Sequence, residues 1–237
     1  MSRLTRSKRG QTLSVARRIT LTAVFAALAF SAIFLFRFNV GTFLTFDLKD
    51  SIITLAGLLL GPATALSVSF LVAMLEFVVD NDTGWYGLIM NFASSATFSV
   101  ICAVMYRYRK KLSGAILGLI LAVLTMVLVM MGLNLLITPI YTGFPRAQVA
   151  GMIPTLLLPF NLVKGTVNAA LVLILYKPIR RALHAARLLP HAYTTEEEVG
   201  KGKRAWVSIL VSIVGILVLA GALATFLWVL HGSIVFW

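Results

Sequence analysis

The chain has 237 residues, of which 59% are hydrophobic and 12% are charged, and its net charge is +13 at pH 7. This composition, with a mean hydropathy of +0.95, excludes a soluble globular domain and indicates a protein that crosses the lipid bilayer several times. The positive charge does not indicate nucleic-acid binding, because 17 of the 21 lysine and arginine residues fall in segments that one membrane orientation places in the cytoplasm.

Apolar stretches predict six membrane spans and a seventh near the carboxyl terminus, at residues 17–38, 48–60, 62–80, 86–106, 113–138, 154–176 and 206–230. The second stretch is short for a full crossing, so we expect it to be tilted, bent or buried among its neighbours. The predicted organisation is a basic cytoplasmic segment at 1–16, a six-span membrane domain at 17–185, a cytoplasmic linker at 186–205 and an additional transmembrane helix at 206–237. The basic amino terminus is expected in the cytoplasm and the carboxyl terminus outside the cell membrane.

The first span places Ala23 and Ala27 four residues apart, on one face of a helix. Small residues at this spacing allow a second helix to approach closely within a membrane. From the sequence alone, this face serves either packing within the bundle or docking of a separate subunit.

The loop after the first span is rich in apolar side chains, among them Phe43, Leu44 and Phe46. A loop this apolar on the outer side of a membrane protein is expected to cover something, either a ligand as a lid or the bundle as a plug. Further along, Gly61 and Pro62 predict a tight inner turn between the second and third spans.

Polar side chains interrupt the later spans. Glu76 lies deep enough in the third span to pair with Lys164 or Arg37. Asn91 in the fourth span and Asn134 in the fifth are placed to join a polar cavity, with hydrogen bonding between helices as the alternative for both.

The sixth span carries Asn161, Lys164 and Asn168 at i, i+3 and i+7, which form one polar stripe on an apolar helix. About eleven helical residues separate Ile153 from Lys164, which puts the ammonium roughly 16 Å into a hydrocarbon layer of about 30 Å. A lysine at that depth costs about 2.5–3.5 kcal/mol, which two amides do not offset. The stripe predicts a binding site for a polar or amphipathic solute. The alternatives are an acidic partner on a neighbouring helix or a lysine that extends to the interface.

The sequence lacks the motifs that are typical of several classes of enzyme. The sequence contains no P-loop, no H-E-x-x-H pattern and no G-x-S-x-G elbow, so neither ATP hydrolysis nor an intramembrane enzyme is expected of this chain. Its single cysteine, Cys102, can form neither a disulfide nor a thiolate metal site alone, and no cofactor is expected. A receptor or scaffold that does not transport stays open as an alternative. A self-sufficient secondary transporter is disfavoured because no inverted pair of interrupted helices is evident.

Several strings in the chain resemble the substrate-binding membrane subunit, the S component, of energy-coupling factor (ECF) vitamin importers, and within that family the riboflavin-specific branch. The most specific of them is Pro159-Phe-Asn-Leu-Val-Lys-Gly165; the others lie at 43–50, 61–62, 83–92, 133–134, 139–141 and 175–177. Together they cover roughly residues 17 to 185.

The resemblance implies an all-α integral membrane protein, a six-helix bundle that here carries one extra C-terminal transmembrane helix. It implies an importer subunit that captures riboflavin or a related flavin outside and delivers it through a coupling subunit and two ATPase subunits. By motif, Asn134, Asn161 and Lys164 would engage the flavin ring, and Ala23 and Ala27 would contact the coupling subunit.

The flavin itself would be enclosed by the apolar loop, with Phe43, Leu44 and Phe46 closing above the ring and Asn91 adding a polar group. The chain also departs from the flavin pattern. Leu88 and Ile89 stand where an acidic residue often precedes the asparagine of the fourth helix, Val72 and Ala73 replace polar positions, and the seventh span lies outside the family core. Riboflavin is therefore the first choice of ligand, with its phosphate or another vitamin-sized heterocycle as the alternative.

Overall fold

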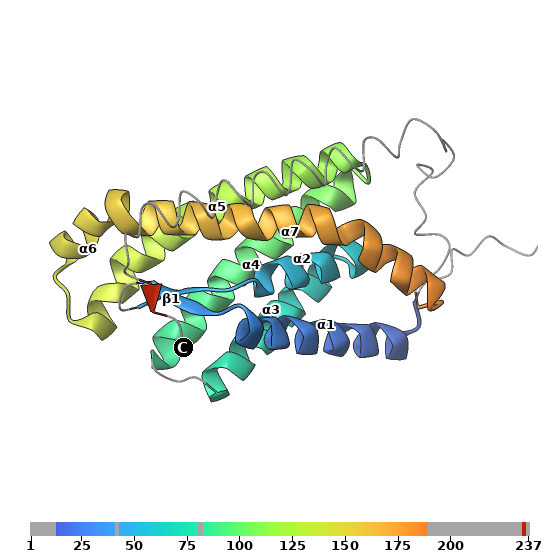
Figure 1. Cartoon of the computed structure of the whole chain (residues 1–237), viewed down its shortest axis with the longest axis horizontal. Coiled ribbons are helices and arrows are strands. Elements are labelled where there is room, and N and C mark those ends of the chain that lie inside the picture. The colour runs from blue at the N-terminus through green and yellow to red at the C-terminus, as the bar shows by residue number, and fades with distance from the viewer. Residues whose placement is uncertain (1–12, 41–42, 80–82, 189–233, 236–237) are drawn as a thin grey trace, which may run out of the picture.

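The computed structural model describes residues 13–40, 43–79, 83–188 and 234–235. Its elements in chain order are α1 (Val15–Leu35), β1 (Phe38–Val40), β2 (Leu44–Phe46), α2 (Lys49–Leu60), α3 (Pro62–Val79), α4 (Gly84–Tyr108), α5 (Leu112–Thr142), α6 (Arg146–Met152), the π-helical turn η1 (Ile153–Leu157), α7 (Leu158–Ala185) and β3 (Ile234–Val235). The long helices run side by side, and the strands and α6 lie near one end of the bundle (Figure 1).

Five helical segments in the described ranges are long and apolar enough to cross a membrane: α1, α3, α4, α5 and the continuous run from α6 to α7. This confirms the prediction of an all-α membrane bundle. The expected spans at 17–38, 62–80, 86–106 and 113–138 correspond to α1, α3, α4 and α5, each within a few residues. The predicted seventh span at 206–230 lies outside the described residues.

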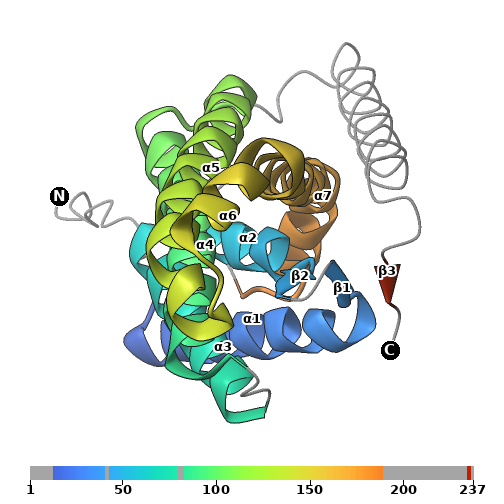
Figure 2. The ribbon, with the colours of Figure 1, turned by 90° about the vertical axis from the view of Figure 1, so that its left-hand side faces the viewer.

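Helix α2 lies in the middle of the bundle, with the longer helices around it (Figure 2). It has 12 residues, and all of them except Ile52 are buried. Gly57 permits close contact with α3, because a Cβ at this position would lie 2.8 Å from Cβ of Ala65. The backbone turns at Gly61, with φ of +107°, directly before Pro62 begins α3. The tight turn was expected from the sequence, and burial was one of the three possibilities given for this short stretch.

The loop after α1 contains an antiparallel β-hairpin that the sequence patterns did not predict. Phe38 on β1 pairs with Phe46 on β2, and the two rings stack with their centroids 4.7 Å apart. Beside them, the Thr45 hydroxyl donates a hydrogen bond to the side-chain oxygen of Asn39 over 3.1 Å. Each strand is three residues long, which is too short for alternation of polar and apolar residues to be recognised. Strand β3 pairs with the other edge of β1.

Candidate functional site

A cavity of about 140 Å³ lies between the hairpin and the neighbouring ends of α3, α4, α5 and α7. Its polar lining comes from elements far apart in the sequence. The hairpin and the residue before it contribute Arg37, Asn39 and Thr45, and the helices contribute Glu76, Asn91, Ser94, Asn134, Tyr141, Asn161 and Lys164. Amide and charged groups that converge from several elements, with aromatic and aliphatic side chains beside them, are typical of a binding site for a small molecule.

The structure brings six of the seven expected ligand-binding residues to this cavity: Phe43, Leu44, Asn91, Asn134, Asn161 and Lys164. The seventh, Phe46, does not line it. Its side chain is buried, stacks on Phe38 and meets the ring of Phe160 edge to face at 6.5 Å. Phe46 therefore fixes the hairpin to α7 instead of facing the cavity.

The two buried amides that line the cavity, Asn134 and Asn161, are oriented by their own helices. The side-chain nitrogen of Asn134 donates to the Met130 carbonyl over 2.8 Å, and its oxygen accepts from the Thr138 hydroxyl over 3.0 Å. The Asn161 nitrogen donates to the carbonyl of Leu157, also over 2.8 Å. An amide offers two donor hydrogens and an oxygen with two acceptor sites. Both groups keep hydrogen-bonding capacity for a ligand.

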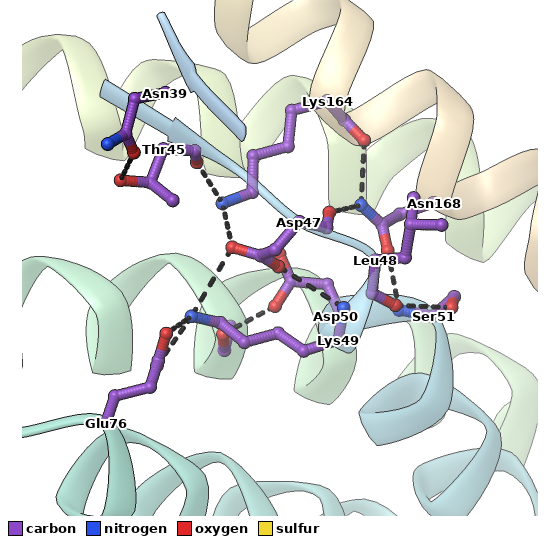
Figure 3. Close-up of polar contacts among 11 residues, drawn as sticks. Asn39, Thr45, Asp47, Leu48, Lys49, Asp50, Ser51, Glu76, Lys164 and Asn168 are labelled. Carbon is purple, nitrogen blue, oxygen red and sulfur yellow. Dashed lines mark hydrogen bonds and ion pairs between the residues drawn. The ribbon is translucent and has the colours of Figure 1, made fainter. Parts of the chain in front are cut away.

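Lys164 bonds to the hairpin and to the connection that follows it (Figure 3). Its ammonium donates to a carboxylate oxygen of Asp47 over 2.9 Å and to the backbone carbonyl of Thr45 over 3.2 Å. The sequence allowed Glu76 to pair with Lys164 or Arg37, and the pairing with Lys164 is wrong. Glu76 instead binds the ammonium of Lys49 through both carboxylate oxygens, at 2.7 and 2.6 Å.

Five ionisable side chains form one buried cluster, each at most 7% exposed: Asp47, Lys49, Asp50, Glu76 and Lys164. The ammonium of Lys49 links the Lys49–Glu76 pair to the Lys164–Asp47 pair, because it also lies 3.5 Å from the Asp47 carboxylate. Asp50 accepts a hydrogen bond from the Ser95 hydroxyl on α4. Asp47, Lys49 and Asp50 were not among the predicted site residues, although three charged residues directly before an apolar stretch were a usable indication of buried pairing.

The Asp47 carboxylate stays ionised in this cluster. Burial raises its pKa, but the ammonium groups of Lys164 and Lys49 have the larger combined effect and lower it to about 2. Asp47 is therefore a negative charge at any physiological pH, and Lys164 has a permanent partner.

The third residue of the polar stripe, Asn168, has a structural role. Its oxygen accepts from the backbone N–H of Ser51 over 2.8 Å, and its nitrogen donates to the backbone carbonyl of Asp47 over 3.1 Å. The Ser51 N–H belongs to the first turn of α2, where the helix itself supplies no acceptor. The stripe thus divides between the cavity, which Asn161 and Lys164 line, and the start of α2, which Asn168 holds.

The two small residues of α1 lie apart from this cavity. Ala23 and Ala27 are both exposed, whereas Ala26 and Ala29 on the same helix are buried at 5% and 0% exposure. In the described part of the chain, Ala23 and Ala27 therefore do not serve the packing of the bundle.

Comparisons with known proteins agree with this architecture. Residues 17–176 match the family described as ECF transporter, substrate-specific component. The chain is 25% identical over 176 residues to the riboflavin transporter RibU of Staphylococcus aureus (strain TCH60), covering 70% of this chain and 92% of that protein. It also resembles a solved S component of a bacterial ECF transporter, with 25% identity and a TM-score of 0.61, over 72% of this chain and 99% of the other. The chain therefore belongs to the substrate-specific components of ECF transporters, which are membrane subunits for transport and not enzymes themselves.

Proposed function

We propose that the chain binds riboflavin, or a closely related flavin, in the cavity beneath the hairpin. The observation that carries this proposal is that Asn134 on α5 and Asn161 and Lys164 on α7 line one cavity. These are the three positions that match the flavin-binding motif of the family. The likeness to a riboflavin transporter supports the same ligand.

The chemistry of the cavity suits a flavin. The flavin ring is broad and apolar, and carbonyl oxygens and ring nitrogens stand at its edge. The cavity offers Phe43, Leu44 and Phe160 as apolar walls, and its amides and ammonium can donate to ring carbonyls.

The cavity must enlarge to admit such a ligand. Its volume of about 140 Å³ is below the roughly 300–1,000 Å³ of sites for molecules of this size. Phe43 lines the cavity, and its ring contacts Tyr141 and Phe144 edge to face, at 6.5 and 6.4 Å. Movement of Phe43 and of the hairpin beside it would enlarge the cavity.

We further propose that the subunit delivers its ligand through a coupling subunit and two ATPase subunits in the cell membrane. Family membership supports such a module, and the exposed pair Ala23 and Ala27 offers a face for it. Small residues favour close helix contact in lipid.

The proposed orientation puts the amino terminus in the cytoplasm and the carboxyl terminus outside. The distribution of basic residues supports it, and so does the pairing of β3 with the hairpin beside the cavity. With an impermeant thiol reagent on intact cells, we expect Ser233→Cys to be labelled and Ser7→Cys to be protected. The native Cys102 is buried, and a variant lacking it provides the background. Equal protection of both sites would exclude an odd number of crossings.

The absorption spectrum of the purified protein tests the ligand directly. A bound flavin makes the preparation yellow and fluorescent, and riboflavin added to ligand-free protein should lose fluorescence on binding. A colourless preparation that neither quenches riboflavin nor binds it in calorimetry would refute the flavin assignment. The S component would then be screened against other vitamin-sized heterocycles.

A further inference from the structure

Two of the three N–H groups of the Lys164 ammonium are already engaged. One donates to Asp47 and the other to the carbonyl of Thr45 on β2. An ammonium carries three donors and no acceptor. Since Lys164 lines the cavity, one donor is left for a ligand there.

Asp47 is itself held in place from several sides. Its carboxylate accepts from the backbone N–H of Lys49 over 3.2 Å and lies 3.5 Å from the Lys49 ammonium. Its backbone carbonyl accepts from Asn168 on α7. With 1% exposure, Asp47 is a fixed anchor between the hairpin, α2 and α7, and Lys164 is oriented against it.

We propose that Asp47 is a positioning residue that couples closure of the β1–β2 hairpin to ligand binding through Lys164. When the hairpin is closed, Thr45 and Asp47 take two donors of the ammonium and leave the third to the cavity. A ligand carbonyl that accepts the third donor completes the arrangement. Hairpin closure and ligand binding then stabilise each other, because both hold the ammonium of Lys164 in the same position. The flavin identity of the ligand rests on the proposed function, whereas the contact between hairpin and Lys164 does not.

A purely structural role is the competing explanation, in which Asp47 only balances the buried charge of Lys164. The two explanations differ in how the effects of Asp47 and Lys164 combine. If Asp47 acts by positioning Lys164, its loss has no further effect on binding once Lys164 is gone. If Asp47 supports the site independently, the two losses add.

The experiment is a double-mutant cycle on the purified full chain, with Asp47→Asn, Lys164→Met and both together. We expect each single variant to weaken riboflavin binding by about tenfold or more, mainly through faster dissociation. The double variant should bind no more weakly than Lys164→Met alone. Additive losses would overturn the proposal.

Two further variants serve as controls. Asp50→Asn also replaces a buried carboxyl group near the start of α2, yet in the described structure Asp50 bonds to Ser95 and shares no hydrogen bond with Lys164. We expect it to affect binding by less than threefold, and an effect equal to that of Asp47→Asn would contradict the proposal. Asp47→Glu keeps the negative charge but moves it along a longer side chain. This variant distinguishes positioning of Lys164 from charge balance if Asp47→Asn does not fold. Unchanged binding by Asp47→Glu would mean that charge balance suffices.

A measurement without ligand separates this proposal from the flavin assignment. Amide hydrogen exchange at Leu44, Thr45 and Phe46 reports opening of the hairpin. We expect exchange to accelerate in Asp47→Asn and Lys164→Met, but not in Asp50→Asn. Unchanged exchange would overturn the coupling. Faster exchange in a protein that binds no flavin would uphold the role of Asp47 and refute only the proposed ligand.

Discussion

Ala27→Trp is expected to abolish riboflavin uptake by cells while the purified subunit still binds its ligand. Ala27 is exposed on α1 and lies outside the cavity lining. Close packing of helices in lipid depends on van der Waals contact between small residues. An indole at this position would therefore hold the coupling subunit away without disturbing the binding site.

Leu28→Trp is the matched control for this prediction. Leu28 is 53% exposed on the same helix, and one residue along a helix turns the side chain by about 100° away from the face of Ala23 and Ala27. Uptake assays and co-purification of the coupling subunit should separate the two variants. If Ala27→Trp weakened ligand binding as much as uptake, the face would belong to the bundle itself.

The membrane helices were predictable because each crossing requires a long apolar run, which the sequence displays directly. The same reasoning marked α2 as too short for an ordinary crossing and left it to be tilted, bent or buried, and the fold shows that it is buried. The hairpin was not predictable in this way. Its strands are short and depend on the pairing of Phe38 with Phe46 and on support from Phe160, and the contact with Phe160 joins distant parts of the chain.

Most residues that line the candidate site were predictable from the sequence, but the pairing of its charged side chains was not. Depth in the membrane indicated that Lys164 needs a ligand or an acidic partner, and Glu76 lay deep enough in another span to pair with Lys164 or Arg37. Depth does not determine the partner, because the fold places Asp47 against Lys164 and Lys49 against Glu76. The position of Phe46 could not be foreseen either, because it follows from stacking across the hairpin.

The other large effect concerns stability and falls on Lys49. Lys49→Met should lower the free energy of unfolding by about 3–5 kcal/mol, because removal of one partner leaves buried charge uncompensated. Lys49 is 1% exposed and faces the carboxylates of both Glu76 and Asp47. For a chain of this size the apparent Tm should fall by roughly 10 °C, which melting of the purified protein in detergent would measure.

Two comparisons show whether an uncompensated buried charge causes the loss of stability in Lys49→Met. Adding Glu76→Gln to Lys49→Met neutralises the carboxylate that lost its partner, so the double variant should regain part of the lost Tm. Lys164→Met should melt at a higher temperature than Lys49→Met, because Asp47 keeps the ammonium of Lys49 at 3.5 Å, although its ligand binding should be weaker. Equal melting of these two single variants would contradict the division of roles, in which Lys49 holds the cluster together and Lys164 serves the cavity.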